Sequence, residues 1–170
     1  MICKKYQDKR GFTIIETMVA VFVIITGVVG VYTLLQQTMS SIRVVSSKLT
    51  ASYLAQEGVE VVRNIRDSNW IKQNTMPGAL WDDEIRGGDW EANYLSQSLI
   101  SGYSGSFLKM DTNGFYGYSS GVNSKYQRKI NIAKTGNYLI KVTVTVYWRE
   151  KGVNNSIVVQ ENLYDWKSRP

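Results

Sequence analysis

Residues 9–35 read KRGFTIIETMVAVFVIITGVVGVYTLL, and this stretch decides the fold of the 170-residue chain. No charged residue occurs from Thr17 to Ile42, and no proline occurs before Pro77. A helix over 12–35 would be about 36 Å long, which exceeds the roughly 30 Å hydrocarbon core of a bilayer. The stretch therefore predicts a helix that crosses a membrane.

The charges beside the apolar stretch predict its orientation. The chain has a net charge of +6, and half of that excess lies in residues 1–11. Basic residues next to a membrane span stay in the cytoplasm. We therefore expect a single-pass protein of the cytoplasmic membrane, with its N-terminus cytoplasmic and everything after Gln36 extracytoplasmic.

Two ordinary interpretations of this segment leave residues unexplained. A cleaved secretory signal needs small residues after the apolar run, but residues 34–39 read LLQQTM. A plain single-span anchor accounts for the length and the orientation but not for Glu16. A carboxylate at the edge of an apolar span costs free energy unless it is paired or has a function.

The order Lys-Arg-Gly-Phe-Thr-x-x-Glu over residues 9–16 resembles the class III leader of type IV pilins and pseudopilins. The resemblance implies that a prepilin peptidase removes residues 1–11 by cutting after Gly11, and that Phe12 is N-methylated. It also implies that Glu16 acts in assembly. The implied partners are that peptidase, membrane lipid before assembly, other pilin or pseudopilin subunits through the N-terminal helix, and the inner-membrane assembly platform. The implied final location is an extracellular or periplasmic fibre.

The apolar pattern continues beyond residue 35 as an amphipathic helix. Apolar residues recur at steps of mostly three or four, which is typical of a helix with one buried stripe. We expect this half, residues 36–68, to pack on a globular head and to end near Arg66, where Asp67-Ser68-Asn69 follows. The predicted stripe consists of Leu35, Met39, Ile42, Val45, Leu49, Tyr53, Val59, Val62 and Ile65.

The remainder, residues 69–170, predicts an antiparallel sheet after a loop-rich stretch. Asn113-Gly114 between apolar runs is a strong hairpin signal. From 138 to 148, apolar residues alternate with polar ones, so Tyr138 and every second residue to Trp148 should face the helix. We predict an α+β fold with four or five strands on one long helix, which resembles the pilin fold. Residues 55–60, 113–116 and 163–167 resemble PilV-like minor pilins.

The composition excludes several kinds of catalytic and metal site. The chain has no histidine, and Cys3 is its single cysteine, so neither a Ser-His-Asp triad nor an intrachain disulfide can form. We predict neither an enzyme nor a bound metal or cofactor. The Asp82-Asp83-Glu84 triplet has calcium-ligand chemistry but is explained by a solvated acidic turn. Asp111-x-Asn113-Gly114 resembles half of a calcium loop and is explained by the hairpin.

One basic cluster leaves a rival function open. Lys125, Arg128, Lys129 and Lys134 lie close to Tyr126, and basic residues mixed with aromatic ones are typical of DNA binding. A polar strand face with charged residues is the commoner cause of such a pattern. The predicted function is a structural or assembly subunit, a minor pilin or pseudopilin, of a type IV pilus-like fibre. The alternatives are a pseudopilin of a type II secretion or DNA-uptake machine, and a single-span protein with a ligand- or DNA-binding head.

Overall fold

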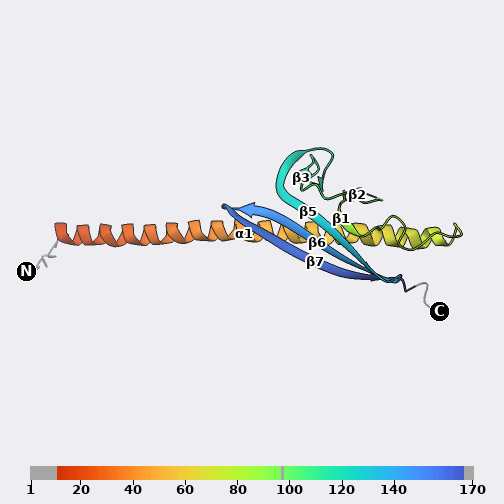
Figure 1. The fold of residues 1–170 in the computed structure, drawn as a ribbon. Helices are drawn as coiled ribbons and strands as arrows, with labels where there is room; N and C mark the ends of the chain where they lie inside the picture. Colours follow the sequence, from red (N-terminus) through yellow and green to blue (C-terminus); the bar gives the residue numbers. More distant parts are fainter. Residues whose placement is uncertain (1–10, 97, 167–170) are drawn as a thin grey trace, which may run out of the picture. The chain divides into compact units, whose positions relative to one another are not determined.

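The computed structural model describes residues 11–96 and 98–166, and they form one long helix followed by an antiparallel sheet (Figure 1). Contacts divide the chain into two compact units, residues 1–43 and 44–170. The predicted α+β class is confirmed. The elements are α1 (Ile14–Gln73), β1 (Gly88–Glu91), β2 (Ile100–Ser101), β3 (Phe107–Met110), β4 (Tyr116–Gly117), β5 (Val122–Thr135), β6 (Leu139–Glu150) and β7 (Val153–Tyr164).

The helix α1 is longer than predicted, because it continues past Arg66 to Gln73. The predicted helix end at Asp67-Ser68-Asn69 was wrong because Asn69 makes hydrogen bonds to a distant segment. Asn69 is only 1% exposed, and its Nδ2 donates to the carbonyl oxygens of Trp81 (3.3 Å) and Asp83 (2.6 Å). Its side chain therefore ties the following loop to the helix instead of competing for the helix backbone.

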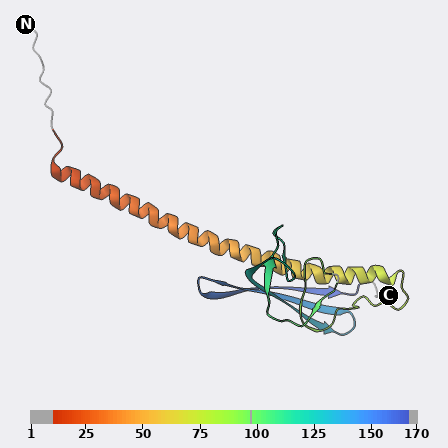
Figure 2. The same cartoon turned by 90° about the horizontal axis from the view of Figure 1, so that it is seen from above.

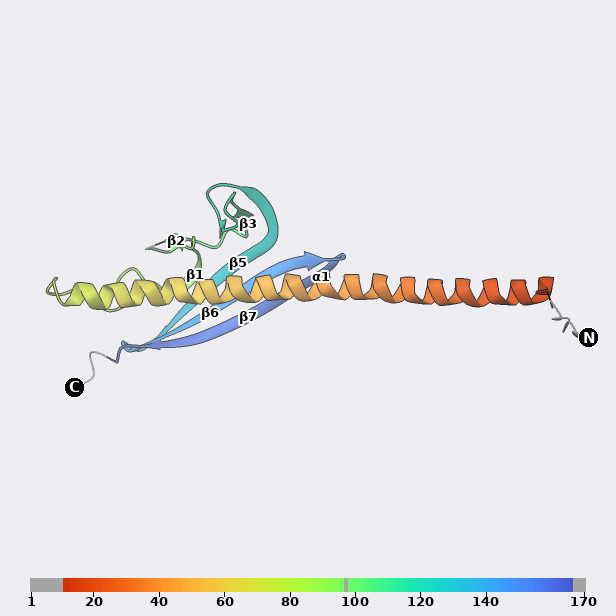
Figure 3. The same ribbon diagram turned by 180° about the vertical axis from the view of Figure 1, so that it is seen from behind.

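The strand β5 is the centre of the sheet. It pairs with β6 from Tyr126↔Trp148 to Thr135↔Leu139, and β6 pairs in turn with β7. Figure 1 and the reverse view in Figure 3 show β6 between β5 and β7. On its other side β5 pairs with β1 and β3, which carry the two-residue strands β2 and β4. Seven strands are thus present among the described residues, against the four or five expected.

Two of the hairpin turns place a glycine at positive φ. Gly114, at φ +86°, closes the β3–β4 hairpin, as the Asn-Gly pair predicted. The β6–β7 turn is confined to Lys151 and Gly152, both with positive φ. Asn154 and Asn155 are therefore strand residues.

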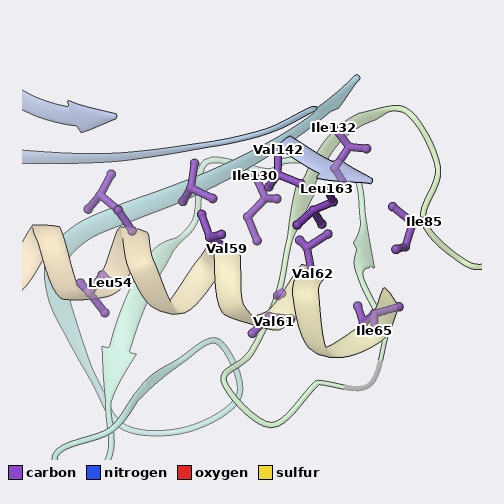
Figure 4. Close-up of a cluster of buried hydrophobic side chains, with 14 of the residues drawn as sticks. Leu54, Val59, Val61, Val62, Ile65, Ile85, Ile130, Ile132, Val142 and Leu163 are labelled. Atoms are coloured by element: carbon purple, nitrogen blue, oxygen red, sulfur yellow. The ribbon is translucent and has the colours of Figure 1, made fainter. Parts of the chain in front are cut away.

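The core lies between the inner face of the sheet and the C-terminal half of α1, where β5, β6 and β7 run beside the helix (Figure 2). Along β6, the predicted alternation is confirmed from Ile140 to Trp148, with each second residue buried. Tyr138 is the exception. It precedes β6, and it is 56% exposed because the chain is still turning there. Figure 4 shows helix and strand side chains meeting, among them Val59, Val62 and Val142.

The buried face of α1 differs from the predicted stripe over most of its length. Val59, Val62 and Ile65 are buried as expected, but the six earlier members are exposed: Leu35, Met39, Ile42, Val45, Leu49 and Tyr53. Small residues take their place against the sheet because they allow a close approach. A Cβ on Gly58, for example, would lie 2.9 Å from Cγ1 of Val144. The buried residues at this level are Ser47, Ala51, Leu54, Ala55 and Gly58.

A buried arginine crosses this core. Arg128 is 0% exposed, and its Nη1 donates to Oε1 of Glu57 (2.7 Å) and to the carbonyl oxygen of Leu54 (3.0 Å). Its Nη2 donates to the carbonyl oxygen of Ala92 (2.6 Å). The guanidinium thus links α1, β5 and the segment after β1. The Tyr118 hydroxyl donates to the Arg128 carbonyl oxygen (3.1 Å), and burial raises the pKa of Tyr118 to about 12.

Candidate processing and assembly site

The predicted cleavage site lies in exposed, non-helical chain. Residues 11–13 precede the first turn of α1. Phe12 is 84% exposed, and a Cβ built on Gly11 would have no atom within 4 Å. A peptidase needs an accessible backbone outside regular structure, and the Gly11–Phe12 bond meets that need. Residues 1–10 of the predicted leader lie outside the described residues.

The first turn of α1 is closed by Thr13 and Glu16. The carbonyl oxygen of Thr13 accepts the first helical hydrogen bond from the amide of Thr17 (3.2 Å). Its Oγ1 accepts a hydrogen bond from the Glu16 amide (3.3 Å). A threonine followed three residues later by a glutamate is the pattern of a capping box, in which the acidic side chain also favours the positive end of the helix dipole. The cap was missed in the sequence, although Thr-x-x-Glu was its signal.

The apolar half of α1 is suited to a lipid environment in its hydropathy and in the hydrogen bonds of its threonine hydroxyls. All described residues from 11 to 39 are exposed, and an 18-residue window of the helix has a mean hydropathy of 2.5. The helix is thus long and apolar enough to cross a membrane. Four of its threonine hydroxyls donate to carbonyl oxygens of the same helix, so these donors are satisfied without water. The pairs are Thr17 to Thr13, Thr26 to Phe22, Thr33 to Gly30 and Thr38 to Leu34.

Comparison with known families assigns this N-terminal segment. Residues 6–32 match the model described as the prokaryotic N-terminal methylation motif. The chain carries a prokaryotic N-terminal methylation motif. The leader predicted from residues 9–16 is therefore supported over a secretory signal or a plain anchor. No curated protein and no solved structure matches the chain.

A motif of this kind implies that another enzyme processes the segment. Cleavage at the Gly11–Phe12 bond would leave a free amine on Phe12, one residue before the Thr13 cap. An ammonium group there sits at the positive end of the helix dipole, which disfavours it. A carboxylate is the group that offsets this cost, and Glu16 is the acidic residue of the first turn.

Three of the acidic candidates in the head are engaged by protein contacts, and the fourth, Glu84, is exposed. Oδ2 of Asp82 pairs with Lys134 Nζ (2.6 Å), and Oδ2 of Asp83 accepts the amide of Leu80 (2.8 Å). Oδ1 of Asp111 accepts the amides of residues 113 and 115, which is the hairpin arrangement. Within residues 11–96 and 98–166, no group of three acidic, cysteine or histidine residues could hold a metal ion.

The predicted basic patch is not a patch in the structure. Arg128 is buried, and Tyr126 is 4% exposed with its hydroxyl on the carbonyl oxygen of Ser47 (3.2 Å). Lys134 is held by Asp82, and Lys125 pairs with Glu150. Lys129 points to the opposite side of β5 from Arg128. The sequence did carry the signal, because Arg128 has the same parity as the buried residues Ile130 and Ile132.

Proposed function

We propose that this chain is a minor pilin or pseudopilin, that is, a structural and assembly subunit of a type IV pilus-like fibre. The methylation motif over residues 6–32 is the observation that carries the proposal. In this proposal a prepilin peptidase removes residues 1–11, methylates Phe12 and leaves 12–35 as the membrane and fibre-core segment. The head is extracytoplasmic, and the inner-membrane assembly platform and neighbouring subunits are the partners.

Exposed apolar side chains beyond the membrane-spanning length favour a fibre over a lone anchor. A span of 12–35 already satisfies a bilayer of roughly 30 Å. Further along α1, Val45, Leu49 and Tyr53 are still 65%, 52% and 62% exposed. Their spacing of four places them along one helix face. A lone anchor gives no reason to expose such a stripe to water, whereas helix packing between subunits would cover it.

The proposed role of Glu16 follows from the cost of bare charge in an apolar environment. Inside a fibre core, the Phe12 ammonium of one subunit and the Glu16 carboxylate of its neighbour would each be costly alone. Bringing the two together lowers both costs, because their attraction is strong where the dielectric constant is low. Any axial slip would separate the pair, so it would also set the register of the subunits.

The direct test of the proposal is the mass of the processed protein. Chain purified from its native membrane should be about 1.3 kDa lighter than the full sequence, with about 14 Da added for a methyl group on Phe12. Intact-mass measurement and N-terminal peptide sequencing decide this. The Gly11→Leu variant should keep its full mass, because a branched side chain is introduced at the cut. A mature N-terminus at Met1, or one after Leu35, would contradict the pilin interpretation.

The exposed stripe of α1 provides a second test, which separates fibre packing from anchoring. We expect Leu49→Ser to be cleaved and to remain folded, since Leu49 is exposed, but to be incorporated several-fold less into sheared fibres. Lys48→Ser, one residue away on another face of the helix, should be incorporated normally. Both would be measured by immunoblot of fibre and membrane fractions. Equal incorporation of the two variants would exclude this face as a packing surface.

A further inference from the structure

A groove of about 480 Å³ lies on the head, on the face of β5 and β6 turned away from the α1 side. Its size falls in the range of small-ligand sites. The rings of Tyr103, Phe107 and Tyr147 line it, together with Gln127, Arg149 and Asn154. The fibre role proposed above does not use this groove.

One wall of the groove is held in place by a buried carboxylate. Glu91 is only 4% exposed, and its Oε1 accepts the Ser104 amide (3.1 Å) and the Ser104 hydroxyl (2.9 Å). On the next residue, the Gly105 carbonyl oxygen accepts a hydrogen bond from Nε2 of Gln127. Burying a carboxylate is costly, and here it fixes the loop that carries Tyr103. A site fixed in advance loses less entropy when a ligand binds.

The rings and amides of the groove are arranged for a ligand with an apolar face and polar edges. Phe107 on β3 lies opposite Gln127 on β5 in the strand register, and Phe107 is 47% exposed. Tyr103 and Tyr147 both line the groove, and burial raises the pKa of Tyr103, with a smaller contribution from Tyr147. Because Nε2 of Gln127 is already engaged, its Oε1 remains as an acceptor.

The charge of the groove favours an anion. Nε of Arg149 donates to the Gly152 carbonyl oxygen (3.2 Å), and among the described residues Arg149 has no acidic partner. Lys125, at the same groove, is already paired with Glu150. Asp and Glu are absent from the outward positions of β5, β6 and β7, which alternate with the buried ones. The groove thus offers one guanidinium that has no acidic partner among the described residues, and the Glu150 carboxylate of β6 is already neutralised by Lys125.

We propose that this groove binds an acidic saccharide, in which a sugar ring carries a carboxylate. The C–H face of the sugar packs on the exposed aromatic rings, and the amides of Gln127 and Asn154 bind its hydroxyl groups. The guanidinium of Arg149 binds the carboxylate through two parallel hydrogen bonds. Single-stranded DNA also stacks on aromatic rings, but binding its phosphates requires several basic side chains along the path of the DNA backbone. One uncompensated arginine favours the sugar acid.

The test uses the full chain in detergent micelles at low ionic strength. The probe is trigalacturonate, and the comparison ligands are neutral galactotriose and an oligothymidylate. Trp148 borders the groove, so its fluorescence can follow binding, with calorimetry as a second readout. We expect saturable binding of trigalacturonate, with an affinity at least about tenfold above those of the two other ligands.

Matched variants locate the site. Arg149→Gln should bring trigalacturonate down to the affinity of galactotriose, and Tyr147→Ala should weaken both sugars about tenfold or more. Lys141→Gln and Tyr164→Ala make similar changes at outward positions of β6 and β7 outside the groove, and they should bind like the wild type. The proposal fails if the wild type does not bind trigalacturonate, if the oligothymidylate binds more tightly, or if the control variants lose as much affinity as the groove variants. The wild-type titration decides the matter even if a variant does not fold.

Discussion

The Glu16→Gln variant is expected to be inserted and cleaved normally but to enter fibres at least about tenfold less well than the wild type. Glutamine is accepted at the third position of a capping box, so the Thr13 cap and the start of α1 should survive. Only the negative charge is removed. Without it, the Phe12 ammonium of a neighbouring subunit is buried with no counter-charge, which is strongly unfavourable in an apolar core.

This experiment has two readouts that must be kept apart. Immunoblots of the membrane fraction report insertion and cleavage, and the sheared-fibre fraction reports incorporation. Glu84→Gln is the matched control, because Glu84 is an exposed acid of the head and forms no ion pair with another described residue. Normal incorporation of Glu16→Gln at equal expression would mean that the charge does not recruit this subunit. Failure of cleavage would place Glu16 in peptidase recognition instead.

The second large effect is expected at Arg128. Arg128→Ala should destabilise the head by about 3–5 kcal/mol, since it breaks a buried ion pair and leaves partners without a donor. Glu57 loses its counter-charge, and the carbonyl oxygens of Leu54 and Ala92 lose their hydrogen bonds. Arg128→Met should cost less than Arg128→Ala, because it refills most of the volume with apolar atoms.

Urea unfolding of the full chain in micelles, followed by tryptophan fluorescence, measures this loss. Trp70, Trp81 and Trp148 are buried, so their emission reports on the head. Lys129→Ala is the control. Lys129 is next to Arg128 but points to the opposite face of β5, and it pairs loosely with Asp89 (3.5 Å). That control should stay within about 0.5 kcal/mol of the wild type. An Arg128→Ala head that is equally stable would show that the pair is dispensable.

The parts of the fold that were predicted correctly depend on local signals. Alternation along β6 marked its buried face from Ile140 to Trp148, and Asn113-Gly114 marked the β3–β4 hairpin. Neither prediction depends on which distant segments pack against these residues. The prediction for Tyr138 was wrong because it relied on the same local alternation. The alternation reaches Tyr138 in the sequence, but Tyr138 lies in the turn before β6 begins.

Among the candidate sites, too, the correct prediction depended on consecutive residues and the wrong one depended on the tertiary structure. The leader was predicted from consecutive residues, and the match over residues 6–32 supports it. The roles of Gly11, Phe12 and Glu16 within it stay predictions until the variants are made. The basic patch was wrong because counting charges near one another in sequence ignores the alternation that sends Arg128 inward and Lys129 outward.

By itself the sequence determined the long helix, its apolar half and the processing motif. Each of these depends on residues that are neighbours along the chain, through hydropathy, helical period or a contiguous signal. Only the tertiary structure decided which face of the upper helix is buried, where small residues around Gly58 replace the expected stripe. It also decided that Arg128 would lie in the core and that Tyr103, Phe107 and Tyr147 would share one groove. These outcomes depend on close approach and on desolvation between segments far apart in sequence, which no local pattern encodes.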